Sequence, residues 1–280
     1  MSISDLILKA RPNLSPSSVK TYTSILSSLH RKCFGGEMDL ADFKDSKRVI
    51  EFLHTKPAAA RKTVLSALVV LTGLEAYKTA MCADIQTFNT DMAKQEASPA
   101  QKAAEVSPAD IKAYKKPHKT VSDLLAISDM VILALLGGIF IPPRRSLDYC
   151  AFKIRDINKE SDNYLDKNEL VFNKYKTAKT YGKQTVAIPA ALKSILTKYI
   201  KLNPTEWLLF DSKMTPLTSV KMNQRLHKIF GGRRVAINAL RHSYLTSKYT
   251  DLSKEQKLMN EDMSAMGSSP AVLNSYVKLS

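Results

Sequence analysis

Four short segments of the sequence carry residue types that could act together on a phosphate group. The first, at 142–149, reads Pro-Pro-Arg-Arg-Ser-Leu-Asp-Tyr and contains Arg144 and Arg145. An arginine keeps its charge at physiological pH and forks onto phosphate oxygens. Asp148 stands three residues after Arg145 and is placed to hold its guanidinium if the turn is helical. Taken alone, the segment also fits a surface pair of arginines at the start of a helix.

The second segment, at 174–183, reads Lys-Tyr-Lys-Thr-Ala-Lys-Thr-Tyr-Gly-Lys. It lies between two apolar runs that have the pattern of strands, so we expect a β-hairpin with a basic tip. A lysine on such a tip can reach a phosphate or a leaving oxygen. The simpler alternative is a solvated charged turn, or one that only contacts a DNA backbone.

The third segment, Ile-Asn-Ala-Leu-Arg-His-Ser, begins at Ile237. Its spacing puts Asn238, Arg241 and His242 on adjacent positions of a helix, and a helix start is itself favourable for a phosphate. Two alternatives stay open. Asn238 also fits the N-cap of this helix, and His242 also fits a packed side chain with satisfied hydrogen bonds.

The fourth segment, at 266–278, contains Tyr276, which could serve as a nucleophile or simply pack on a terminal helix. Metal chemistry is not indicated. The five histidines are not spaced from one another or from the cysteines as metal ligands would be. They are His30, His54, His118, His227 and His242. Nor does the sequence contain a glycine-rich nucleotide-binding motif.

The composition favours a polyanionic partner. The 280 residues include 42 Lys and Arg against 26 Asp and Glu, a formal charge of +16 spread along the whole chain. Such a charge attracts nucleic acid, and the release of counterions from the phosphates would supply the binding affinity. The three scattered cysteines suit a reducing compartment. The longest apolar run, 130–141, is too short to cross a bilayer, and the N-terminal residues do not form a signal peptide. We therefore expect an intracellular protein without a membrane segment.

The hydrophobic pattern predicts two domains and a linker. Residues 1–92 are predicted to form a small helical domain, and residues 93–120, rich in Ala, Ser, Pro and Lys, an interdomain linker. Residues 121–280 are predicted to combine helices with a small sheet. The predicted helices are 16–34, 46–54, 57–71, 79–94, 121–140, 190–201, 219–230, 238–249 and 269–277, and the predicted strands are 152–155, 169–172 and 185–188. The expected fold class is mainly α with a small antiparallel β-sheet (α+β).

In this order and at these separations, the four segments resemble the tyrosine recombinase (phage integrase) family. The resemblance covers about residues 121–278, and the preceding helices look like the family's core-binding domain, which clamps DNA. The segment at 142–149 looks most like recombinases of eukaryotic mobile elements, large DNA viruses and virophages. The resemblance implies a helical core-binding domain followed by a catalytic domain.

The resemblance also implies a role for individual residues. Arg145 and Arg241 match the two catalytic arginines, Lys176 matches the hairpin lysine, and Tyr276 matches the nucleophile. Asp148, Lys179 and His242 match accessory positions, with Lys179 as the fallback for Lys176. Three departures stand out: Asn238 replaces the usual His, Ser268 replaces the usual His or Trp, and only four residues follow Tyr276.

The function implied is the breakage and rejoining of DNA strands through a covalent phosphotyrosine, in DNA recombination or integration of a mobile element or viral genome. It needs no cofactor or metal. The partner would be double-stranded DNA, bound by a homo-oligomer, usually a tetramer in this family, in the nucleus, cytoplasm or a virus factory. The candidate DNA contacts are Arg61, Lys62, Arg144, Lys174, Lys183, Arg233 and Arg234. Two alternatives remain: a catalytically weakened DNA-binding relative, and a DNA-relaxing enzyme like the type IB topoisomerases.

Overall fold

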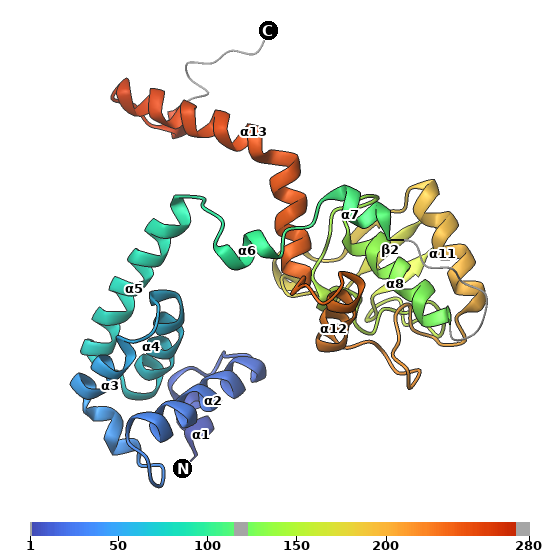
Figure 1. Ribbon diagram of the computed structural model, residues 1–280. Coiled ribbons are helices and arrows are strands. Elements are labelled where there is room, and N and C mark those ends of the chain that lie inside the picture. The colour runs from blue at the N-terminus through green and yellow to red at the C-terminus, as the bar shows by residue number, and fades with distance from the viewer. Residues whose placement is uncertain (1, 115–122, 273–280) are drawn as a thin grey trace. The chain divides into compact units, whose positions relative to one another are not determined.

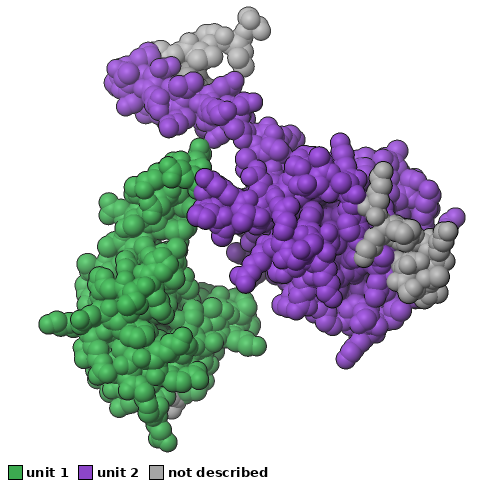
Figure 2. All heavy atoms as spheres, viewed as in Figure 1, with its two compact units in different colours: residues 1–96 green, residues 97–280 purple. Residues whose placement is uncertain are grey.

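The computed structural model describes residues 2–114 and 123–272 and divides into two compact units, 1–96 and 97–280, which Figure 2 colours green and purple. Each unit has its own cluster of buried apolar side chains. The described residues are mainly helical with one three-stranded antiparallel sheet, so the predicted fold class is confirmed. The interval predicted as a linker holds two short helices, α6 (Pro99–Ala103) and α7 (Pro108–Ala113), each begun by a capping box.

Unit 1 is entirely helical in its described part (Figure 1). Its elements are α1 (Ile3–Ala10), α2 (Pro16–Cys33), the 3₁₀ turn η1 (Leu40–Lys44), α3 (Ser46–Leu53), α4 (Ala58–Thr72) and α5 (Glu75–Ala93). The four predicted helices correspond to α2–α5. As expected, the Ser15 hydroxyl caps α2, where it accepts from the amide of Ser18 at 3.2 Å. The sequence prediction omitted α1, which a capping box of Ser2 with Asp5 begins.

Unit 2 packs its helices and sheet around one long apolar helix. Its elements are α8 (Asp123–Leu136), α9 (Ser146–Tyr149), β1 (Tyr164–Asp166), β2 (Glu169–Phe172), α10 (Ala178–Tyr181), β3 (Gln184–Ala187), α11 (Ala190–Leu202), α12 (Ser219–Ile229), α13 (Ile237–Ala265) and the 3₁₀ turn η2 (Pro270–Val272). The residues from Val131 to Leu136 are all buried, so α8 is surrounded on every side over these turns. Helices α11, α12 and α13 all contact α8.

The sheet has the order β1-β2-β3, and both pairings are antiparallel. The predicted hairpin is confirmed: Leu170 lies opposite Val186 in the β2–β3 pair. The strand predicted at 152–155 is wrong, because only Lys153 forms isolated bridges there. Left-handed residues flank the segment, at Ala151 (φ 55°) and Asp156 (φ 49°), and they turn the chain before a strand can develop.

Helix α13 continues sixteen residues past its predicted end at Tyr249, to Ala265. The added turns are largely exposed and lack a continuous buried stripe, so periodicity gives no signal for them. They contain no glycine or proline, and most of the residues are good helix formers. The helix ends at Gly267 (φ 68°), where the amide of Ser268 donates to the carbonyl of Met263 at 2.8 Å. Of the helix predicted at 269–277, only η2 falls within the described residues.

Candidate active site

Three of the four sequence segments meet at a cavity of about 220 Å³ in unit 2. The first segment contributes Arg145 and Asp148 to its lining, and α13 contributes Arg241. Tyr175 and Thr177 line it from residues 173–183, which connect β2 to β3 and which we name the lysine loop. Residues almost a hundred positions apart in the sequence therefore face one small space.

Arg145 and Arg241 are the two cations of this cavity whose donors have no partner in the described part of the chain. Arg145 occupies the N-cap position of α9, and Arg241 lies in the first turn of α13 beside the buried Leu240. Both side chains are half-buried. Within residues 2–114 and 123–272, neither guanidinium has a hydrogen-bond or ion-pair partner. Two fixed positive charges with unused forked donors make the cavity suitable for an oxyanion such as a phosphate.

Asp148 is held by Arg144 rather than by Arg145, which corrects the sequence expectation. The Nε of Arg144 donates to Oδ2 of Asp148 at 2.9 Å, whereas Arg145 offers its backbone carbonyl to the Asp148 amide at 3.1 Å. Arg144 precedes α9, and Arg145, at the N-cap position, has an extended backbone conformation (φ −71°, ψ 153°), so the pair of Arg144 with Asp148 is not a contact within the helix.

The Asp148 carboxyl is buried, with 2% of the residue exposed. Burial raises its pKa above the ordinary value, although the charges of Arg144, Arg145 and Arg241 act to lower it. Its Oδ1 atom has no hydrogen-bond partner among the described residues. The carboxyl therefore places a buried acidic group beside the cluster of guanidinium charges in the cavity lining.

The lysine loop is more ordered than the turn that the sequence predicts. It contains the single helical turn α10, and the hydroxyl of Tyr175 donates to the carbonyl of Gly182 at 2.6 Å, which closes the loop at its base. Lys176 is exposed and stands between the two lining residues Tyr175 and Thr177, but it does not itself line the cavity. The fallback Lys179 is also exposed, on α10.

The first turn of α13 decides between the alternatives for Asn238 and His242. Ala236 occupies the N-cap position, without a capping side chain, so the N-cap interpretation of Asn238 is wrong. Asn238 and His242 are both exposed, so His242 is not a packed core side chain. Asn238 lies three residues before Arg241, on the same face of the helix, but outside the cavity lining.

The fourth segment is only partly described. Tyr276 lies outside the described residues. Ser268 follows the end of α13 and is not part of the cavity lining. The structure therefore brings together the two arginines and the loop that carries the lysines, and it leaves the nucleophile and Ser268 as sequence predictions.

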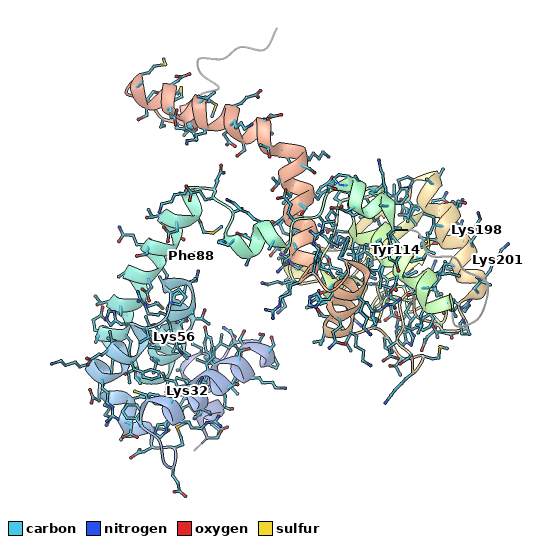
Figure 3. The ribbon with its side chains drawn as sticks, viewed as in Figure 1. Lys32, Lys56, Phe88, Tyr114, Lys198 and Lys201 are labelled. Atoms are coloured by element: carbon cyan, nitrogen blue, oxygen red, sulfur yellow. The ribbon has the colours of Figure 1, made fainter. Side chains whose placement is uncertain are left out.

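The residues predicted to contact DNA differ in whether their charged groups are already bound by other groups of the protein. The Nε of Arg61 donates to both carboxylate oxygens of the buried Asp84, at 3.1 and 3.0 Å. The ammonium of Lys62 lies 3.0 Å from the ring centroid of Phe88, which Figure 3 labels on α5. Lys174, Lys183, Arg233 and Arg234 are exposed, and Arg233 also donates to the carbonyl of Glu105. Sequence reasoning passed over Lys198 and Lys201, two exposed lysines on α11 that Figure 3 labels.

Sequence reasoning also missed two side chains that assemble the site. Gln184, the first residue of β3, lines the cavity and accepts a hydrogen bond from Arg144. Asn163 is buried and joins the segment of Asp148 to the lysine loop. A lone Gln or Asn gives no pattern in a sequence, because its importance comes only from what the fold places beside it.

Two further observations concern the described part of the chain. No group of three or more His, Cys, Asp or Glu residues is arranged there to hold a metal ion. None of the helices described is both long and apolar enough to span a membrane.

Comparisons with known proteins give a structural likeness only. No protein-family model matches the sequence, and no curated protein is significantly similar to it. Among solved structures, lambda integrase (residues 75–356) bound to DNA shares 14% identity at a TM-score of 0.45, over 91% of this chain and 89% of that one. The Tn1549 transposon integrase in complex with circular intermediate DNA shares 14% at 0.44, over 100% and 96%. XerA recombinase shares 12% at 0.35, over 88% and 82%.

Proposed function

We propose that this chain is a site-specific DNA recombinase or integrase that breaks and rejoins DNA strands through a covalent phosphotyrosine. The observation that carries the proposal is the cavity shared by Arg145 and Arg241, whose guanidinium groups have no hydrogen-bond or ion-pair partner among the described residues. The order of the sequence segments supports it, because each half of the arginine pair comes from a segment that resembles the corresponding recombinase motif. In this proposal residues 1–92 form the DNA-clamping domain, 93–120 the linker and 121–280 the catalytic domain.

The chemistry follows from the residue types. The Tyr276 oxygen attacks a backbone phosphorus, a new P–O bond forms, and the bond to the leaving oxygen breaks. Negative charge grows on the non-bridging oxygens, and Arg145 and Arg241 stabilise it, at about 3 kcal/mol for each well-placed donor. Lys176 gives its proton to the leaving oxygen. The phosphotyrosine conserves the energy of the broken bond, so rejoining needs no nucleotide cofactor.

The proton of the Tyr276 hydroxyl also has to leave. An amide cannot accept it near neutral pH, so Asn238 does not serve as the base. His242, beside Arg241 and exposed, is the titratable neighbour in the first turn of α13. We therefore expect slower cleavage than a histidine at position 238 would support.

Binding to duplex DNA is expected to depend strongly on salt. The formal charge of +16 supplies many phosphate contacts, and each one releases counterions. Four protomers on two duplexes would complete strand exchange, in a DNA-containing compartment of a cell that carries the mobile element or virus.

Covalent capture tests the proposal. Wild type and Tyr276→Phe are incubated with sheared DNA, quenched with SDS, and the DNA retained on the protein is sequenced. We expect an adduct from wild type that is absent from the Phe variant, while both bind DNA equally. The retained sequence then identifies the target site.

Each other outcome selects an alternative. Tight, salt-sensitive binding without an adduct from wild type would indicate the non-catalytic relative. An adduct accompanied by relaxation of supercoiled DNA by a monomer, without recombinant products, would indicate the topoisomerase-like enzyme. An adduct that persists in Tyr276→Phe would overturn the assignment of the nucleophile.

A further inference from the structure

Arg144 stands next to Arg145 in the sequence but contacts a different set of groups. Its Nε donates to Oδ2 of Asp148 and its Nη1 to Oε1 of Gln184, both at 2.9 Å. The side chain of Arg144 is 18% exposed and that of Asp148 is 3% exposed. The Arg144 guanidinium thus links the segment of the catalytic arginine to the first residue of β3, forty positions later in the chain.

The same guanidinium also contacts the other arm of the hairpin. Its central carbon lies 4.0 Å from the ring centroid of Phe172, the last residue of β2, and 5.0 Å from that of Tyr175. Tyr175 in turn closes the lysine loop through its bond to Gly182. Arg144 therefore touches both arms of the hairpin at the base of the loop, and Lys176, Lys179 and Lys183 lie in the loop between these contacts.

We propose that Arg144 is a positioning residue, which holds the lysine loop in place beside Arg145 and so delivers Lys176 to the leaving oxygen. The part of this inference that concerns Lys176 rests on the proposed function. The part that concerns the placement of the loop rests on the contacts of Arg144 alone. The DNA contact predicted for Arg144 from the sequence is replaced by this internal role, because its fork is already occupied.

An arginine is required here for geometric reasons. One planar group donates in two directions while its faces stack on aromatic rings, and an ammonium cannot do this. A lysine would keep the positive charge beside Asp148. It would lose the hydrogen bond to Gln184 and the contacts of the guanidinium with the two aromatic rings. Arg144→Lys therefore tests the forked guanidinium donors separately from the positive charge, which the lysine retains. Gln184→Ala removes the hydrogen bond that Arg144 donates to Gln184 and leaves the ion pair of Arg144 with Asp148 intact. It therefore tests whether Arg144 holds the lysine loop without disturbing the buried ion pair.

The first test measures hydrogen–deuterium exchange without DNA, for wild type, Arg144→Lys, Arg144→Gln and Gln184→Ala. We expect peptides over 173–183 to exchange about tenfold faster in all three variants, while peptides of α11 and of unit 1 stay unchanged. The control is Arg11→Gln, which removes an exposed arginine from unit 1. Unchanged exchange of the loop in Gln184→Ala and Arg144→Lys would overturn the proposal, and so would acceleration across the whole of unit 2 in both.

The second test measures the rate of adduct formation on two DNA substrates. In one of them sulfur replaces the bridging oxygen that leaves, and a thiolate leaves without needing a proton. With ordinary DNA we expect Arg144→Lys to be slower by about a hundredfold, in the range of lost general acid catalysis. With the sulfur substrate we expect it to approach the wild-type rate, as Lys176→Ala does. Arg145→Ala, which loses charge stabilisation instead, should stay slow on both substrates.

The two tests separate this inference from the proposed function. An equal loss on both substrates in Arg144→Lys would show that the residue does not act through the proton donor. If wild type forms no adduct with either substrate, the proposed function fails, and the exchange experiment still decides whether Arg144 holds the loop.

Discussion

The side-chain amide of Asn163 donates a hydrogen bond to the backbone carbonyl of Asp148 at 2.9 Å, in the interior of unit 2. The same amide nitrogen donates to the carbonyl of Lys174 at 2.7 Å. Its oxygen accepts from the backbone amides of Asn173 and Lys174, at 2.8 and 2.7 Å. One side chain, 4% exposed, therefore joins the segment of Arg145 to the start of the lysine loop.

Replacing Asn163 by alanine is expected to destabilise unit 2 strongly. The change removes one buried and three partly buried hydrogen bonds to the backbone. Each buried group left without a partner costs about 1–3 kcal/mol, so we expect a total loss of about 3 kcal/mol. Trp207, the one tryptophan of the chain, lies in unit 2 and reports urea unfolding by its fluorescence. Asn168→Ala, at an exposed turn, is the matched control and should change the free energy of unfolding by less than about 0.5 kcal/mol. Equal effects of the two changes would contradict this role.

Removing either free guanidinium should slow cleavage while leaving DNA binding nearly intact. In the proposed function Arg145 and Arg241 stabilise charge that develops only in the transition state, so Arg145→Ala and Arg241→Ala should each reduce the rate of adduct formation by about 100- to 1000-fold. The DNA dissociation constant, measured at fixed salt, should change only a few-fold. Arg234→Ala, an exposed arginine outside the cavity, should alter binding and its salt dependence but not the rate at saturating DNA. A normal cleavage rate in Arg145→Ala would exclude this cavity as the reaction site.

The parts of the fold that sequence patterns predicted are those with a buried stripe or a sharp boundary. Ser15 and Pro16 begin α2 as expected, and the apolar run before the lysine loop forms β2. The prediction failed where the structure does not depend on a buried stripe or a sharp boundary. The later turns of α13 have no stripe to detect, and the left-handed residues Ala151 and Asp156 interrupt an apolar run that otherwise has the pattern of a strand.

The candidate site shows the same division. Arg145 and Arg241 were identifiable because their residue types and segments point to phosphate chemistry, and the fold brings them to one cavity. The partner of Asp148 was not identifiable, because the expected spacing assumed a helical turn, whereas the observed partner Arg144 lies before the first residue of α9. Nor was Asn163, since its four bonds depend on a tertiary arrangement that no local pattern encodes.

The stability of unit 2 should fall in acid partly through Asp211. The hydrogen bond from Lys221, followed by those from the amides of Thr215 and Lys213, holds the pKa of this carboxyl well below its usual range. A carboxyl with a lowered folded-state pKa contributes its full stability above the unfolded-state pKa of about 3.9, and it loses this stability progressively as pH falls from there toward the folded-state pKa. Asp211→Asn should therefore unfold at lower urea than wild type at pH 7.

The difference between wild type and Asp211→Asn should narrow steadily below about pH 4, because the wild-type carboxyl then becomes neutral in the unfolded chain first. Trp207 fluorescence in urea at several pH values between 7 and 3 measures this difference. Asp166→Asn, in β1 and only distantly paired with Lys159 at 3.8 Å, is the control for the removal of a carboxylate and should lower the free energy of unfolding less at pH 7. A constant gap for Asp211→Asn across the whole range would contradict the lowered pKa.

Restoring a histidine at position 238 should accelerate cleavage in a pH-dependent way. Asn238 is exposed in the first turn of α13, on the face of Arg241, so Asn238→His changes the chemistry without disturbing the core. A neutral imidazole can take the proton from the attacking phenol, whereas an amide cannot. The imidazole is neutral above its pKa of about 6.5, so the ratio of the variant's rate to the wild-type rate should rise through that pH and reach about tenfold or more at pH 8. Single-turnover adduct formation between pH 5.5 and 8.5 measures this ratio, with Asn238→Gln as the control that cannot titrate. A ratio that does not change with pH would mean that position 238 lies outside the path of the proton, and that His242 or solvent accepts it instead.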